Sequence, residues 1–181
     1  MFKIKEIVDW KSLTTLSITI ATATIIIAAT VTVTPKATAA TLEKINASRE
    51  ISAPINKVWN ILTDIENMTK YWTNLKVVEN ITKMDNITEI DVMGGPENLT
   101  GHQIVTLKPM QYFTINTTET EALPIPNMTA ILTPISDNLT NIDIEWNIDM
   151  SKVPPPGRNN VKNNFMETTE NAFNRIAQAA E

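Results

Sequence analysis

Histidine and carboxylate side chains are the groups that could do acid–base chemistry in this chain, because its 181 residues include no cysteine. His102 is the only histidine, and an imidazole titrates near neutral pH, so His102 is a candidate catalytic acid or base. One histidine without cysteine excludes a two-histidine metal site and a thiolate nucleophile. His102 also follows Gly101 at the edge of a predicted loop, where it would simply be solvated. We therefore predict no catalytic residue, with His102 as the one alternative.

The carboxylates recur at alternate positions of predicted strands. Asp143, Glu145 and Asp149 alternate with apolar residues such as Ile144 and Trp146, so they belong to the opposite, solvated face of that strand. The chain contains no glycine-rich phosphate loop, nucleophile elbow or acidic metal cluster. We predict neither a cofactor nor a metal site.

Acceptor triplets for N-glycosylation are more frequent than the composition alone would produce. Eight Asn-x-Ser/Thr triplets occur, none with proline in the middle, at Asn46, Asn67, Asn80, Asn86, Asn98, Asn116, Asn127 and Asn138. An N-linked glycan must point to solvent, so the triplets indicate a glycosylated domain outside the cytoplasm. The alternative is an Asn/Thr-rich surface that only favours solubility.

An uncharged segment near the N-terminus has the length of a membrane span. Residues 13–33 contain no charge and include seven threonines; as a helix they would extend about 32 Å, close to the ~30 Å hydrocarbon core of a bilayer. Lysines within residues 1–12 favour a cytoplasmic N-terminus. We expect a signal-anchor helix at 13–33 and a tether at 34–43. One alternative is a signal peptide that is cleaved near Ala39. A buried helix is a second alternative, which the sequence favours less.

The remaining domain, residues 44–181, would then lie outside the cytoplasm, either held at the cell membrane by a single span or secreted. Without cysteine it has no disulfides and must be held by its core, for which its length suffices. Residues 41–181 carry 11 basic and 18 acidic residues, a net charge of −7. We therefore expect no nucleic-acid partner, because phosphate binding needs a basic face.

Hydrophobic periodicity predicts the elements of this domain. A strand at 42–52 precedes two short helices, and six strands with a period of two follow. The expected inward residues include Phe113, Ile115, Leu75 and Val77. Val78 is expected to face outward. Residues 94–101 are predicted as a loop and 153–157 as an extended proline connector. A long helix at 159–180 follows, with an apolar stripe through Phe165, Phe173 and Ile176.

The segment from Arg49 to Trp72, REISAPINKVWNILTDIENMTKYW, carries a family resemblance. It combines a strand ending in Ala53-Pro54, a helix through Val58 and Trp59, and a second short helix capped by Thr63 or Asp64. It resembles the START-like helix-grip superfamily (SRPBCC) of polyketide cyclase/dehydrase and lipid-transport domains. The resemblance implies an α+β fold in which a curved antiparallel sheet of about seven strands wraps around a long C-terminal helix.

The resemblance also implies an apolar cavity between sheet and helix. The residues expected to face it are mostly aromatic: Trp59, Trp72, Phe113, Trp146, Phe165, Thr169 and Phe173, with Thr117 and Tyr112 as further hydroxyls. We expect a membrane-anchored, non-catalytic domain that binds a hydrophobic or lipid-like molecule. The alternatives are a cyclase- or dehydrase-like enzyme that uses His102 in the cavity, and a structural module of a glycosylated cell envelope.

Overall fold

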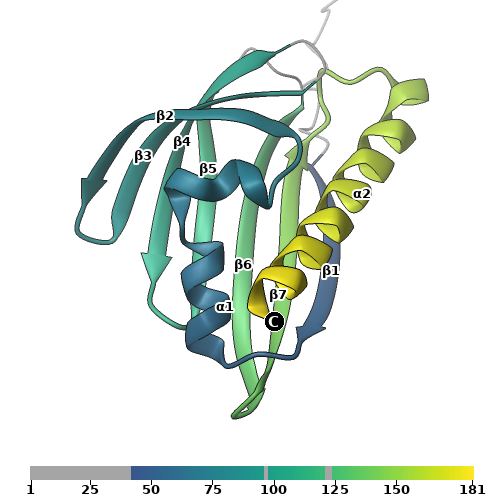
Figure 1. Cartoon of the computed structure of the whole chain (residues 1–181). Helices are drawn as coiled ribbons and strands as arrows, with labels where there is room; N and C mark the ends of the chain where they lie inside the picture. The colour runs from purple at the N-terminus through teal and green to yellow at the C-terminus, as the bar shows by residue number, and fades with distance from the viewer. Residues whose placement is uncertain (1–41, 96–97, 121–123) are drawn as a thin grey trace, which may run out of the picture. The chain divides into compact units, whose positions relative to one another are not determined.

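The computed structural model describes residues 42–95, 98–120 and 124–181 (Figure 1). The elements are β1 Leu42–Ile51, α1 Ile55–Leu62, the 3-10 helix η1 Ile65–Lys70, β2 Leu75–Met84, β3 Ile87–Gly94, β4 Leu99–Lys108, β5 Tyr112–Thr120, β6 Ile125–Ser136, β7 Leu139–Asp149 and α2 Pro155–Ala180. None of the helices within these residues is long and apolar enough to cross a membrane. The expected anchor at 13–33 and most of the tether lie outside the described residues.

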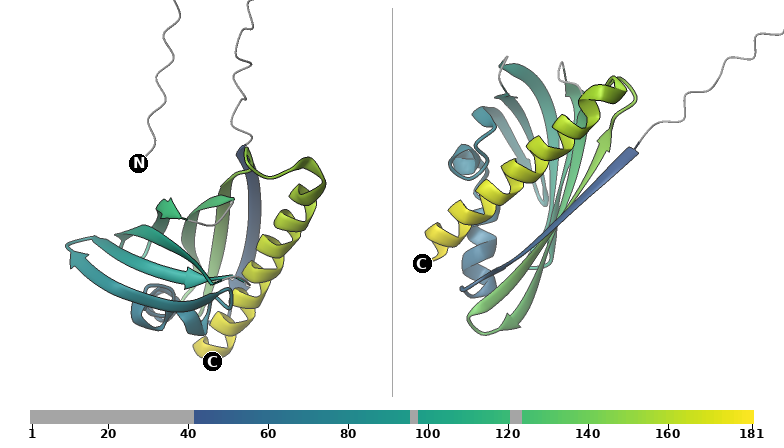
Figure 2. Two further views of the ribbon diagram at one scale, coloured as in Figure 1. Left: turned by 90° about the horizontal axis from the view of Figure 1, so that it is seen from above. Right: turned by 90° about the vertical axis from the view of Figure 1, so that its right-hand side faces the viewer.

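All seven strands form one antiparallel sheet in the order β1-β7-β6-β5-β4-β3-β2. The first strand therefore pairs with the last, and the two short helices fall between β1 and β2. The helices lie on one face of the sheet (Figure 1), and Figure 2 shows α2 running obliquely across that face. The α+β helix-grip architecture expected from the sequence is confirmed.

The core lies between the sheet and α2. Alternate residues of β7, among them Ile142, Ile144 and Ile148, are fully buried, as is Ile176 on the stripe of α2. Each such side chain contributes roughly 1.5–3 kcal/mol relative to an exposed one. Residues 37–181 form a compact unit, and all the buried apolar side chains of the described chain belong to it. The buried apolar side chains of the described residues thus pack into one core cluster within this unit.

The predicted faces of β2 are correct at Leu75 and wrong at Val77 and Val78. Two register shifts interrupt its pairing with β3, and Leu75, Val78 and Ile81 are the residues that pack against the core. A β-bulge inserts an extra residue and thereby resets the alternation of faces. Asn80 lies within the second irregularity at a φ of 52°, and its side chain is exposed.

Helix α2 begins earlier than expected. Pro155 and Pro156 occupy its first two positions, so only Val153 and Pro154 of the predicted connector precede it. Proline is tolerated there because the first N–H groups of a helix have no intrahelical partner. Strand β4 likewise begins at Leu99, inside the predicted loop.

The predicted side-chain cap of the second short helix is also absent. Asp64 occupies the N-cap position of η1, but it makes no capping hydrogen bond. Its carboxylate instead accepts a hydrogen bond from the amide of Asn67 at 2.9 Å.

Candidate ligand-binding pocket

A pocket of about 580 Å³ opens between α2 and the ends of strands β2 to β6. Short side chains and glycines make up much of its sheet side, including Gly94, Gly101 and Thr117. Phe165 and Thr168 face it from α2. The other lining residues are Thr73, Asn74, Leu75, Lys76, Val92, Gly95, Leu99, Thr100, Gln103, Thr120, Pro124, Pro126, Asn164 and Glu167.

Three aromatic rings, each in contact with the next, lead from the pocket into the core. The Phe165 ring, which lines the pocket, meets the Trp146 ring edge-on with centroids 5.1 Å apart. Trp146 in turn meets Trp72 at 5.8 Å, with the ring planes nearly perpendicular. Edge-to-face contacts of this kind are favourable and directional. They hold Phe165 as a fixed apolar wall of the pocket.

The expected cavity residues divide into two groups. Phe165 lines the pocket, and so does Thr117, one of the two further hydroxyls. The remaining six are buried in the core outside the pocket lining: Trp59, Trp72, Phe113, Trp146, Thr169 and Phe173. Tyr112 lies apart, partly exposed, with the ammonium of Lys108 5.6 Å from its ring centre. A role for the six core residues as ligand contacts stays a prediction.

The polar lining was not expected from the sequence. Gln103 occupies an inward position of β4, opposite Ile90 and two residues from the buried Val105. A polar residue in line with apolar inward residues is a sequence signal that could have identified it. Lys76 also lines the pocket, and its ammonium donates to the side-chain oxygen of Asn98 at 2.6 Å.

A close backbone approach shapes the rim beside β2. Gly95 donates its N–H to the carbonyl of Asn74 at 2.9 Å, and Gly95 has a φ of 70°. A β-carbon added to Gly94 would lie 2.3 Å from that carbonyl oxygen. Glycine is therefore required at 94, because only it lets the two segments meet.

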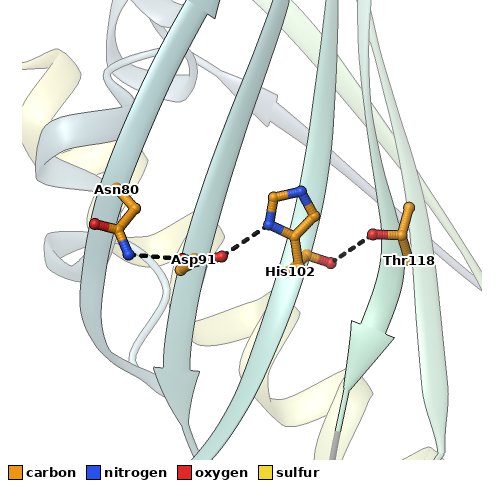
Figure 3. Close-up of polar contacts among 4 residues, drawn as sticks. All are labelled: Asn80, Asp91, His102 and Thr118. Atoms are coloured by element: carbon orange, nitrogen blue, oxygen red, sulfur yellow. Dashed lines mark hydrogen bonds and ion pairs between the residues drawn. The ribbon is translucent and has the colours of Figure 1, made fainter.

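His102 lies on the outer face of the sheet, away from α2 (Figure 3). Its Nδ1 is 2.7 Å from a carboxylate oxygen of Asp91, and Asn80 donates to the other oxygen at 2.7 Å. Because a carboxylate can only accept, the imidazole carries its proton on Nδ1. The bond to Asp91 raises the pKa of His102, and the bonds from His102 and Asn80 lower the pKa of Asp91.

The position of His102 bears on the enzymatic alternative. That alternative needs the imidazole in the cavity, whereas His102 is absent from the pocket lining. It lines a second hollow of about 490 Å³ with Glu79 and Glu119, which shares the lining residues Val92, Thr100, Gly101 and Thr120 with the pocket. Within the part of the chain that the structure describes, no three histidine or carboxylate side chains converge as metal ligands.

Most of the asparagines in the glycosylation triplets are exposed. Six of the eight acceptor asparagines are exposed: Asn46, Asn80, Asn86, Asn98, Asn116 and Asn138. Asn67 and Asn127 are half-buried, and the oxygen of Asn127 accepts the backbone N–H of Thr117 at 2.9 Å. None of the eight lines the pocket, and none lies on α2.

Comparison with known families agrees with this geometry. The family model described as polyketide cyclase / dehydrase and lipid transport matches residues 43–181. The chain belongs to this family. The match covers the whole sheet except its first residue, and the whole of α2. Comparison with curated proteins gives no match.

Three solved structures share the fold. The Zhui aromatase/cyclase from Streptomyces sp. R1128 has a TM-score of 0.69 at 13% identity, covering 77% of this chain and 93% of its own. A START superfamily protein from Mycobacterium smegmatis has a TM-score of 0.61 at 13% identity, covering 76% and 96%. A conserved protein from Geobacillus kaustophilus has a TM-score of 0.57 at 18% identity, covering 75% and 93%. Identities this low show the shared fold alone.

Proposed function

We propose that this domain binds a hydrophobic or lipid-like molecule in the pocket between α2 and the sheet, without catalysing a reaction on it. The observation that carries the proposal is the pocket itself, about 580 Å³, walled by Phe165 and several aliphatic and proline side chains. Pockets of this size and lining suit apolar or amphipathic small molecules. The family's description, which includes lipid transport, supports the same class of ligand.

We further propose that the domain lies outside the cytoplasm, held at the cell membrane by residues 13–33. The uncharged length of that segment and the exposed acceptor asparagines support this location. The entry of the chain into the domain also suits a membrane ligand. Leu42 pairs with Asp149, which pairs with Ile125, next to the pocket residues Pro124 and Pro126. A tether ending at Leu42 would thus join the domain at its pocket end.

The binding proposal is tested with the unit of residues 37–181 and the apolar fluorophore N-phenyl-1-naphthylamine. We expect saturable fluorescence enhancement for the wild type. Replacing Thr168, which lines the pocket from α2, by phenylalanine should fill the space and weaken binding at least about tenfold.

The matched control for that experiment is Met166→Phe. Met166 lies on the same helix and is 52% exposed, so the exchange leaves the apolar surface nearly unchanged and the pocket untouched. Equal binding by wild type and Thr168→Phe would contradict the pocket as the binding site. A well-folded wild type that binds no apolar probe would favour the structural envelope module instead.

The location proposal has its own measurement. Intact mass of the protein from its native membrane should show residues 1–33 retained and hexose-containing additions at several acceptor triplets. A mass equal to residues 40–181 would indicate cleavage near Ala39 and secretion. An unmodified full-length chain would contradict glycosylation and leave the pocket proposal standing.

A further inference from the structure

The pocket has one charged side chain on each of its two walls. Among the described residues that line it, Lys76 of β2 and Glu167 of α2 are the charged ones, and they have opposite signs. Both residues are exposed at the surface, so their charged ends lie at the opening of the pocket. Phe165, by contrast, supplies an apolar wall. A ligand with an apolar chain inside the pocket would therefore place its head group near both charges.

The Lys76 ammonium is held at the rim by one neutral partner, because it donates to Oδ1 of Asn98 at 2.6 Å. Strand β3 lies between β2 and β4, and Leu75 pairs with Gly94, which pairs with Leu99. To reach Asn98, the Lys76 side chain crosses the end of β3, where the lining residue Gly94 has no side chain. An ammonium can donate three hydrogen bonds, so two of its donors remain available to a ligand.

The protein neutralises neither charge. Within the part of the chain that the structure describes, the ion pairs involve other residues, and Lys76 and Glu167 do not pair with each other. Glu170, the next carboxylate of α2, differs in this respect, because it lies 3.9 Å from the guanidinium of Arg49. An unpaired ammonium and an unpaired carboxylate on facing walls are complementary to a ligand that carries both opposite charges.

We propose that the ligand is a zwitterionic amphiphile, whose anionic group binds Lys76 and whose cationic group binds Glu167 while its apolar chain fills the pocket. This inference rests on the proposed binding function and narrows its ligand class. A purely anionic head group, such as that of an ionised fatty acid, would meet the carboxylate of Glu167 as a like charge. A purely cationic head group would meet the ammonium of Lys76 in the same way.

The test uses the unit of residues 37–181 and three probes with the same alkyl chain, each below its critical micelle concentration: dodecylphosphocholine, dodecyl phosphate and dodecyltrimethylammonium. Displacement of N-phenyl-1-naphthylamine at low salt measures the affinity of each probe. We expect the wild type to bind the zwitterionic probe about threefold more tightly than either singly charged probe, because exposed ion pairs contribute modestly. The preference should decrease as salt is added.

Two single variants separate the contributions of the two charges. Lys76→Met, which keeps the length of the side chain without the ammonium, should bind the two phosphate-containing probes about threefold more weakly. Glu167→Gln should bind the two probes that contain trimethylammonium more weakly by a similar factor. Lys83→Met on β2 and Glu170→Gln on α2 are the matched controls, since each makes the same change of charge outside the pocket lining. Both controls should behave as the wild type.

The outcomes separate the two proposals. If the wild type binds a singly charged probe as tightly as dodecylphosphocholine, the zwitterion proposal is overturned and the binding function stays intact. The same holds if Lys76→Met and Glu167→Gln keep the wild-type preference. Failure of all three probes and of N-phenyl-1-naphthylamine to bind the wild type overturns the proposed function itself. All four exchanged side chains are exposed, so the variants should fold, which circular dichroism checks.

Discussion

Trp146 of β7 and Thr169 of α2 join the sheet to the long helix through a buried hydrogen bond. The indole N–H of Trp146 donates to the Thr169 hydroxyl at 2.9 Å. That hydroxyl in turn donates to the carbonyl of Phe165, one turn back, at 2.7 Å. Because Phe165 lines the pocket, the same three residues connect the core to the candidate site. Every polar atom of this chain of bonds has a partner, which a buried tryptophan requires.

Replacing Thr169 by valine should destabilise the domain by about 1–3 kcal/mol. Valine has the same shape but leaves the Trp146 N–H buried without an acceptor. The free energy of unfolding is measured by urea denaturation of residues 37–181. Thr169→Ser retains the hydroxyl, so its free energy of unfolding should fall clearly less than that of Thr169→Val. Thr168→Val, one residue away and facing the pocket, is the matched control; an equal loss there would contradict the assigned role of Thr169.

Two glycine-to-alanine exchanges should have opposite effects. Gly94→Ala sets a β-carbon 2.3 Å from the Asn74 carbonyl oxygen, so backbone must move, at a cost of about 1–3 kcal/mol. Gly157→Ala lies in the first turn of α2, where the nearest atom outside the helix backbone is 3.7 Å away. Alanine should stabilise that helix by up to about 1 kcal/mol. Thermal unfolding of both variants checks the signs, and a neutral Gly94→Ala would contradict the close approach at the rim.

The order of elements could be predicted because their patterns are long and regular. In β7, residues from Ile142 to Ile148 alternate without interruption, and the structure buries them as expected. The apolar residues of α2 from Phe165 onward likewise follow a regular helical spacing. The prediction of the faces of β2 failed because a bulge depends on the pairing of β2 with β3. The sequence of β2 alone does not show that pairing.

The position of the pocket could not be predicted from side-chain type alone. Aromatic residues were expected in its walls, but large side chains fill the space where sheet and helix lie close, as Trp72 and Trp146 do. Empty space remains where the facing residues are short, as at Gly101 and Thr117. Finding the pocket requires the register of the five strands whose ends line it, which is tertiary information.

Asn80 offers a test of the bulge in β2. Its φ of 52° lies in the left-handed region, which glycine adopts freely and alanine does not. Both Asn80→Ala and Asn80→Gly lose the hydrogen bond to Asp91. The difference between their free energies of unfolding therefore reports the backbone conformation at residue 80. In protein from a bacterial host, Asn80→Ala should be less stable than Asn80→Gly by about 1 kcal/mol. A more stable alanine variant would show that residue 80 does not adopt the left-handed conformation.

The pair of His102 and Asp91 predicts a pH window for its contribution to stability. The bond to Asp91, aided by Glu89 and Glu119, raises the pKa of His102 above 6.5, and the bonds from His102 and Asn80 lower the pKa of Asp91 below 3.8. The contribution of His102 to stability is complete below the pKa that His102 has in the unfolded chain. It is lost as the pH rises through the higher pKa that His102 has in the folded domain. The contribution of Asp91 to stability is complete above the pKa that Asp91 has in the unfolded chain. It is lost as the pH falls through the lower pKa that Asp91 has in the folded domain. The pair therefore stabilises most between these two transitions.

Nuclear magnetic resonance can follow this titration without ambiguity, because His102 is the only histidine in the chain. We expect its pKa to lie above 6.5 in the wild type and to fall in Asp91→Asn, since the exchange removes the carboxylate that stabilises the imidazolium. Glu145→Gln, on the distant strand β7, is the matched control and should leave the pKa of His102 unchanged. The same pKa in Asp91→Asn and wild type would mean that the 2.7 Å contact does not persist in solution. Both carboxyl and imidazole are partly exposed, so the shift should shrink as salt is added.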